Sequence, residues 1–233
     1  MDIVCFGANG ATGRLVVKQA LASGHAVAAF TRHPETFPFR DDRLQLVGGD
    51  VLDPSSVDKA VSGRDAVLSS LGVPFSRKPI TVYSQGVANI VQAMQHHGVR
   101  RLVCVSATPV DPRYDTQGGF IFEKMLQPVI SHTLGRTMYA DLRRMEKLVM
   151  QSNLDWTILR PSGLFSTPSV TDYQVTDGFV SGRFTSRTDL ADCLLRQLGD
   201  DQNVHKALAV ATVSGQPSFL QFFLTEAIGK KAA

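Results

Sequence analysis

The residues MDIVCFGANGATG (1–13) join a strand-like run to a glycine loop. Asp2–Phe6 is short and apolar, as in a buried strand, and the loop spaces Gly7, Gly10 and Gly13 ahead of a helical pattern. Such a loop lets the backbone approach a pyrophosphate and directs the amides of a helix N-terminus at it. Because this loop lies between a strand and a helix, it predicts a dinucleotide site rather than an ordinary tight turn.

Strand-like and helical segments alternate along the rest of the chain. The predicted strands are 2–6, 25–31, 44–47, 66–70, 101–106, 155–160 and 206–210, and the predicted helices are 13–23, 55–61, 81–97, 141–152, 188–198 and 219–228. The strands are continuously apolar, which is typical of a parallel sheet covered on both faces. We therefore expect an α/β fold with a doubly wound parallel, Rossmann-like sheet in a single domain over 1–233. The segment 161–183, rich in Ser, Thr, Gly and Pro, is expected to be a loop or a small C-terminal cap over the substrate site.

Composition excludes several classes of protein. The 233 residues carry 24 Lys and Arg against 21 Asp and Glu, and this net charge of +3 is scattered, so no nucleic-acid partner is expected. No apolar run reaches the roughly 18 residues of a spanning helix, and the apolar start lacks the basic leader of a signal peptide. Cys5, Cys104 and Cys193 are too widely spaced for a disulfide framework or a zinc motif. We expect a cytoplasmic protein with no membrane partner and no metal site.

The end of the second predicted strand indicates which dinucleotide binds. An NAD site usually has an acidic residue there that accepts from the ribose 2′-hydroxyl. This chain has Thr31-Arg32 instead, with no carboxylate before Glu35. The planar guanidinium of Arg32 suits a 2′-phosphate, and Arg14 adds a second positive charge at the start of the first helix. These residues predict NADP(H) as the cofactor, the alternative being that Arg32 is a solvated residue at a strand end.

Two further strand ends point to the same crevice, where open α/β sheets bind ligands. Asp50 follows the third strand and is placed to reach the adenine amino group, while Val51 packs on the ring. After the fourth strand come Ser70, Leu71 and Gly72, a segment in which small residues let a ribose lie against the backbone. Each feature has an ordinary alternative, since the first pattern also makes a turn and the second a polar strand end.

Four parts of the chain resemble the atypical short-chain dehydrogenases/reductases. They are the glycine loop followed by Arg14, the Thr31-Arg32 strand end, Gly49-Asp50-Val51 and the run DWTILRP (155–161). The chain is similar to the NAD(P)H-binding, NmrA-like group, which includes biliverdin/flavin reductases, from its start to the predicted helix 188–198. The resemblance implies cofactor-binding roles for Gly7, Asn9, Thr12, Gly13, Arg32, Asp50 and Val51, and it places Ser106 and Pro161 near the nicotinamide. The predicted cofactor site also includes Gly10, Ala11, Arg14, Ser70, Leu71 and Gly72.

Reduction requires the protein to hold a nicotinamide against an electrophilic carbon and to supply a proton. Short-chain dehydrogenases usually pair a Tyr with a Lys four residues later, and no tyrosine of this chain has that partner. The nearest variant is Tyr139 with Arg143, one helical turn apart, where the arginine would stabilise a phenolate. The alternative is a surface tyrosine beside an ordinary basic residue. Ser106 ends the fifth predicted strand, so Ser106 and Tyr139 are the catalytic candidates.

Other titratable residues are weaker candidates. His96-His97 closes a predicted helix just before Gly98, where a cation interacts favourably with the helix dipole, so we interpret the pair as helix-ending residues. Lys124, in a predicted helix over 120–126, and His132 are further donors that no motif places at the site.

Together these features predict an NADP(H)-dependent reductase that transfers hydride to a small molecule of the carbonyl, quinone or flavin type. Quinones and flavins need little acid assistance, which fits the missing Tyr-Lys pair. The main alternative, which the missing pair fits equally, is a non-catalytic NADP-binding sensor of the NmrA-like type that reports redox state to a partner. A nucleotide-sugar epimerase or dehydratase is disfavoured, because those enzymes carry the Tyr-Lys pair and a larger C-terminal domain. Assembly as a homodimer stays open at this stage.

Overall fold

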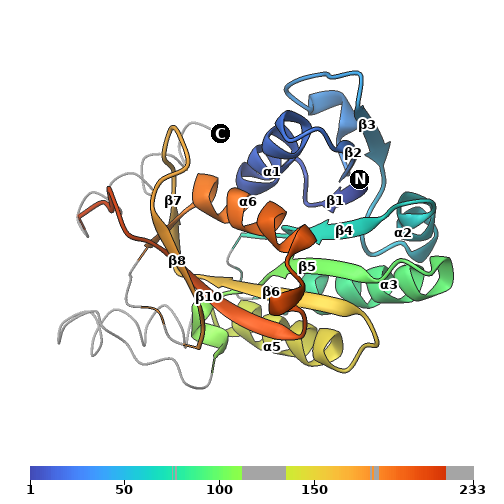
Figure 1. The fold of residues 1–233 in the computed structure, drawn as a ribbon. Coiled ribbons are helices and arrows are strands. Elements are labelled where there is room, and N and C mark those ends of the chain that lie inside the picture. The colour runs from blue at the N-terminus through green and yellow to red at the C-terminus, as the bar shows by residue number, and fades with distance from the viewer. Residues whose placement is uncertain (75, 77, 112–134, 179, 181–183, 219–233) are drawn as a thin grey trace.

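The computed structural model describes residues 1–233 apart from 75, 77, 112–134, 179, 181–183 and 219–233 (Figure 1). The predicted helix 219–228 and the candidates Lys124 and His132 lie outside the described residues. Within the described part, an eight-stranded sheet lies between two layers of helices, which confirms the predicted doubly wound α/β fold. No described helix is both long and apolar enough to cross a lipid bilayer.

The strands of the main sheet are β1 Asp2–Phe6, β2 Ala26–Thr31, β3 Leu44–Gly48, β4 Ala66–Ser69, β5 Arg101–Val105, β6 Asp155–Pro161, β8 Tyr173–Asp177 and β10 Lys206–Thr212. Their order is β3-β2-β1-β4-β5-β6-β10-β8. Neighbouring strands are parallel, except that β8 runs antiparallel to β10. The strand order changes direction beside β1, and ligands of such sheets bind where the carboxyl ends of the strands meet this point.

Helices cover both faces of the sheet. The described α-helices are α1 Ala11–Ala22, α2 Pro54–Val61, α3 Val82–His97, α5 Arg136–Met150 and α6 Arg187–Arg196, and short 3-10 turns occur at Pro34–Thr36, Thr108–Val110, Gln197–Gly199 and Asp201–Asn203. α1 packs beside α6 on one face, while α2, α3 and α5 cover the other (Figure 1). Each face buries its own apolar core, which explains why the strands are apolar on both sides.

The segment expected to be a loop or cap contains regular structure. β8 forms the outer edge of the main sheet, and Gly163–Phe165 (β7) pairs with Phe184–Ser186 (β9) in a separate ladder. In β8, Tyr173 and Val175 pack against the core shared by α1 and α6, while Gln174 and Asp177 are exposed. The sequence pattern does not reveal β8, because five residues of mixed polarity give a weaker signal than the continuous apolar runs of the parallel strands. A covering role of 161–183 over a substrate stays a prediction.

Side chains satisfy the backbone amides at several helix starts. Asp53 accepts from two amides in the first turn of α2, at 3.2 Å each, and Pro54 occupies the first helical position. At the start of α3 the acceptor comes from another helix, because the fully buried Asp141 of α5 accepts from the amides of Tyr83 at 2.9 Å and Ser84 at 3.3 Å. The start of α3 is thereby fixed to α5.

Candidate functional site

The loop between β1 and α1 is a tight turn in which two glycines are sterically required. Gly7 has φ +77°, and a Cβ there would lie 2.6 Å from the carbonyl oxygen of Ser70, next to β4. A Cβ on Gly13 would lie 2.1 Å from the Gly7 carbonyl oxygen, so the first turn of α1 packs directly on the loop. The amide of Gly10 donates to the same carbonyl oxygen at 3.0 Å and closes the turn. The turn and packing roles expected of Gly7 and Gly13 therefore have a steric basis.

The N-terminus of α1 leaves its first amides free of side-chain caps. Its N-cap is Gly10, and its first turn contains no acidic residue. Gly10 and Ala11 are exposed and Thr12 is half-buried. Uncapped amides and the positive end of the helix dipole favour an anion at this point. The site has the features that the sequence predicted for pyrophosphate binding.

Asn9 and Arg14 tie the glycine loop to the turn that follows β2. The Asn9 side-chain amide donates to Thr36 Oγ1 at 2.9 Å, and Asn9 Oδ1 accepts from Arg14 Nε at 2.9 Å. The Thr36 hydroxyl donates to the His33 carbonyl oxygen at 2.9 Å. Sequence analysis assigned Asn9 and Arg14 to the cofactor, and the structure shows that they also hold two loops together. No motif indicated the partner Thr36, which lies 27 residues from Asn9.

Arg32 lies at the carboxyl end of β2, and no described residue forms an ion pair with it. The amide of His33 donates to Thr31 Oγ1 at 3.1 Å, which turns the chain at Arg32. The Arg32 side chain is exposed and has no hydrogen-bond or ion-pair partner within the described part of the chain. Glu35, the first carboxylate after it, lies 3.3 Å from His33 Nδ1. A permanent cation next to the glycine loop therefore remains available to an anion.

Asp50 and Val51, which follow β3, take part in a turn and in the core. Asp50 Oδ1 accepts from the Leu52 amide at 3.0 Å, and its carbonyl oxygen accepts from the Asp53 amide at 2.9 Å, so the turn alternative describes its contacts. Val51 is 7% exposed, and a Cβ on Gly86 of α3 would lie only 2.9 Å from its side chain. The adenine contacts expected of Asp50 and Val51 stay predictions.

Ser70, Leu71 and Gly72 leave the sheet at the end of β4. Ser70 donates to the Phe6 carbonyl oxygen through its amide at 3.0 Å and through its hydroxyl at 3.3 Å. Leu71 packs against the core of α2, α3 and α5, while Gly72 is exposed and has open space where a Cβ would project. The Ser70 hydroxyl thus has a structural contact with β1, and the predicted ribose contact falls to the backbone of this segment.

The hydroxyl of Ser106 is buried at the carboxyl end of β5 and lacks a hydrogen-bond partner in the described part of the chain. The residue is 6% exposed, and its amide donates to the Leu159 carbonyl oxygen of β6 at 2.7 Å. Its Oγ has no hydrogen-bond partner among the described residues. An unpaired buried hydroxyl costs about 1–3 kcal/mol, so a ligand that supplied the missing bond would be favoured there. Pro161, also buried, ends the neighbouring strand β6.

A buried ion network that the sequence did not predict is centred on Arg160, directly before Pro161. Arg160 Nε and Nη2 donate to the two carboxylate oxygens of Glu146 at 2.9 and 2.7 Å, and Nη1 donates to Asp111. These residues are 5%, 4% and 8% exposed, respectively. The network connects β6 to α5 and to the loop that carries Ser106, so it supports the position of that hydroxyl. No motif revealed it, because the partners of Arg160 lie 14 and 49 residues away.

Tyr139, the other catalytic candidate, is half-buried on α5. Arg143, one turn later, is exposed and donates to the Pro109 carbonyl oxygen at 3.2 Å. α5 packs on the 3-10 turn Thr108–Val110 just after Ser106, so the two candidates come from neighbouring elements. The structure gives Arg143 a backbone partner, and a proton-donor role for Tyr139 stays a prediction.

Comparison with known proteins assigns the chain to a family. A family model described as NAD(P)H-binding matches residues 7–201. The chain belongs to the NAD(P)H-binding family. This membership confirms the resemblance to the NAD(P)H-binding group that the glycine loop and the strand ends indicated.

Similar proteins differ in how much of their length this family member covers. An uncharacterized chloroplastic protein of Arabidopsis thaliana is 33% identical over 174 residues, which are 70% of this chain and 59% of that protein, so the chain spans less than two thirds of it. YhfK of Bacillus subtilis, an uncharacterized sugar epimerase, is 26% identical over 219 residues, 89% of this chain and 92% of YhfK. A short-chain dehydrogenase/reductase of Veillonella parvula, solved in complex with NADP, superposes with a TM-score of 0.77 at 19% identity over 94% of this chain and 99% of that structure. This last likeness shows the shared fold.

Proposed function

We propose that this NAD(P)H-binding protein is an NADP(H)-dependent reductase for a small carbonyl, quinone or flavin-like acceptor. The observation that carries the proposal is the buried hydroxyl of Ser106 at the carboxyl end of β5, which has no partner among the residues that the structure describes. Ser106 lies at the carboxyl ends of the strands, where open α/β sheets bind ligands, and the glycine loop and Arg32 lie at the same end of the sheet. The residues present fit a nicotinamide dinucleotide, because a cradle that excludes side chains and an unpaired buried donor are both features of a ligand site.

The cofactor would be held by four parts of the chain. The uncapped amides of α1 and the loop Gly7–Gly13 would receive the pyrophosphate. Arg32 would bind the 2′-phosphate with a charge-assisted hydrogen bond, and this preference makes NADP(H) rather than NAD(H) the proposed cofactor. Gly72 has open space beside it where a ribose would lie, and Pro161, which ends β6, would lie near the nicotinamide. A neighbour of the same fold binds NADP, which supports the assignment.

Reduced nicotinamide, when bound, supplies the hydride. Ser106 would orient the acceptor by donating a hydrogen bond to its oxygen, and the Arg160 network would hold the loop that positions Ser106. Tyr139 or a water molecule would deliver the proton. Because the sequence contains no Tyr-x-x-x-Lys motif, acceptors such as quinones and flavins that need little acid assistance fit best. The segment 161–183 would cover the acceptor.

A titration followed by an activity screen tests this proposal. Purified full-length protein is titrated calorimetrically with NADPH and with NADH, and then loss of nicotinamide absorbance is followed with a panel of quinones, flavins and simple carbonyls. Tighter binding of NADPH and its oxidation by at least one acceptor are expected. NADPH binding without oxidation by any acceptor would favour the second candidate, a non-catalytic NADP sensor, which the Arg143–Pro109 contact and the missing lysine also fit. If neither nucleotide binds, the cofactor assignment fails.

A further inference from the structure

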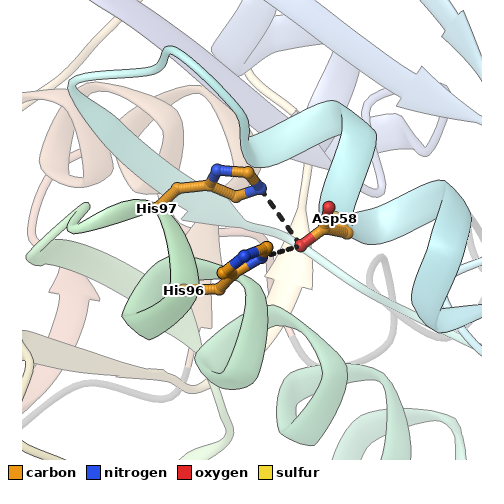
Figure 2. A group of neighbouring side chains, drawn as sticks. All are labelled: Asp58, His96 and His97. Atoms are coloured by element: carbon orange, nitrogen blue, oxygen red, sulfur yellow. Dashed lines mark hydrogen bonds and ion pairs between the residues drawn. The ribbon is translucent and has the colours of Figure 1, made fainter.

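Away from the candidate cofactor site, the structure brings two adjacent histidines onto one carboxylate (Figure 2). Asp58 lies within α2, and His96 and His97 are the last two residues of α3. His96 Nδ1 is 2.8 Å and His97 Nε2 is 3.1 Å from the same atom, Asp58 Oδ1. The sequence led us to interpret the histidines as helix-ending cations and to expect no metal site, because Asp58 is 38 residues from His96 and forms no motif with it.

This cluster offers three ligand atoms to a single point. The two imidazole rings are 4.5 Å apart between centroids, and the three atoms lie within 4.8 Å of one another. His97 Nε2 is buried and makes no hydrogen bond of good geometry to any described residue, although Asp58 Oδ1 is close. Two imidazole nitrogens and one carboxylate oxygen are atoms that coordinate a single divalent cation in proteins.

The observed nitrogen–oxygen separations of 2.8 and 3.1 Å are slightly shorter than the separations between two ligand atoms of a small divalent ion. Zn²⁺ lies about 2.0–2.2 Å from imidazole nitrogen and carboxylate oxygen, so two ligand atoms in a tetrahedral site are roughly 3.3–3.6 Å apart. A small outward rotation of the side chains would therefore open the two nitrogen–oxygen distances far enough. The His96 and Asp58 side chains are 69% and 39% exposed, which leaves them room to rotate and leaves space for water.

We propose that Asp58, His96 and His97 bind one divalent transition-metal ion of the zinc type, with water completing its coordination. Two imidazoles and one carboxylate are ligands that such ions prefer, whereas Mg²⁺ and Ca²⁺ take oxygen ligands. The ligands come from two helices that pack side by side on the same face of the sheet. Binding therefore fastens α2 to α3.

The proposed metal site lies at the amino ends of the strands, and the candidate cofactor site lies at their carboxyl ends. α3 starts after the carboxyl end of β4 and returns to the beginning of β5 at Arg101, so His96 and His97 lie where strands begin. Gly7, Arg32 and Ser106 lie where strands end. The ion is thus expected to change the stability of the protein and to leave nucleotide affinity unchanged.

Zinc binding by the full-length chain tests the proposal. The protein is purified without a histidine tag, stripped with a chelator and titrated calorimetrically with zinc chloride alone. One site per chain is expected. Co²⁺ in place of zinc is expected to give the visible absorption of tetrahedral cobalt. Zinc at a hundredfold excess over its Kd should raise Tm by about 5–10 °C, because it binds the folded state only.

Variants separate this site from adventitious binding. His96→Ala, at an exposed position, and Asp58→Asn are each expected to raise the Kd for zinc at least tenfold and to remove the Tm shift. His97→Gln should do the same while keeping a polar side chain at the half-buried position. His33→Ala is the matched control, because His33 is also an exposed histidine beside a carboxylate, that of Glu35.

Two results would overturn the proposal: no heat and no Tm shift in the wild-type chain, or an unchanged zinc affinity in His96→Ala. NADPH titrations with and without zinc test the cofactor site by itself, so a failure of zinc binding does not count against the proposed function.

Discussion

Arg32 and Arg160 are the same residue type at the carboxyl ends of two strands of one sheet, yet their surroundings are opposite. Arg160 is 5% exposed, and its guanidinium is shared between the carboxylates of Glu146 and Asp111. Arg32 is exposed and has no partner among the residues that the structure describes.

The hydroxyls near the site differ in the same way. Thr108 Oγ1 donates to the Arg160 carbonyl oxygen at 3.0 Å, while Ser106 Oγ, two residues earlier, is buried and has no partner in the described part of the chain. Groups whose bonds are complete hold the scaffold together, whereas incomplete groups identify where a ligand is expected. Substitutions of groups with complete bonds should therefore lower stability, and substitutions of groups with incomplete bonds should change ligand binding or turnover.

Removing Arg160 is expected to have the largest effect. Arg160→Met removes the guanidinium that the buried carboxylates of Glu146 and Asp111 share, which should lower the free energy of unfolding by about 3–5 kcal/mol. Urea unfolding followed by circular dichroism measures this. A loss below about 1 kcal/mol would mean that the network contributes little to stability and that water reaches the carboxylates.

Removing Arg32 should affect binding rather than folding. Arg32→Ala is expected to weaken NADPH by about 1.5–3 kcal/mol, which is roughly 10- to 150-fold in Kd, and to change NADH affinity by no more than about threefold. Arg43→Ala is the matched control, since Arg43 is an exposed arginine just before β3 whose partner is Asp41. Calorimetric titration of both nucleotides decides the matter. An equal loss for NADPH and NADH would contradict the 2′-phosphate assignment.

Ser106 and Thr108 provide a matched pair of hydroxyls. Ser106→Ala should lower turnover about tenfold and leave NADPH affinity within a few-fold. Unfolding stability should be unchanged or higher by up to about 1 kcal/mol, since no bond is lost. Thr108→Val removes a hydrogen bond and should cost about 0.5–1.5 kcal/mol of stability. If Ser106→Ala costs as much stability as Thr108→Val, then the Ser106 hydroxyl is structural.

The smallest effect concerns a surface ion pair. Arg100 donates to both carboxylate oxygens of Asp155 at 2.9 Å, and this contact lowers the pKa of Asp155. The side chains are 66% and 33% exposed, so Arg100→Ala should cost only about 0.2–1 kcal/mol at pH 7. Because the folded pKa lies below that of the unfolded chain, near 3.9, the pair stabilises at neutral pH and ceases to do so as pH falls through the folded pKa. Urea titrations at pH 7 and at about pH 2.5 should show the difference between variant and wild type disappear.

Local sequence was sufficient for the parallel part of the fold. Runs such as Asp2–Phe6 are apolar throughout because both faces of the sheet are covered, and the glycine spacing that predicted the first turn is explained by the contacts of Gly7 and Gly13. α5 begins at Arg136 rather than at 141, and Met138 and Tyr139 of its first turn pack against the core. β8 was missed because an edge strand needs no continuous apolar run.

Contacts between distant residues could not be predicted from local pattern. The Arg160 network, the Asn9–Thr36 bond and the Asp58–His96 contact join residues 14 to 49 positions apart. Their residue types are ordinary in sequence, and only the packing of loops and helices brings them together. The candidate cofactor residues were predictable because their positions follow from the order of strands and helices.

The antiparallel strand β8 also has a consequence for solubility. It covers the outer edge of β10, whose residues Lys-Ala-Leu-Ala-Val-Ala-Thr would otherwise present unpaired amides and carbonyls along an apolar strand. An exposed edge of this kind is a template for pairing with other chains. Cleavage or mutation that detaches β8 is therefore expected to cause aggregation before it affects the glycine loop.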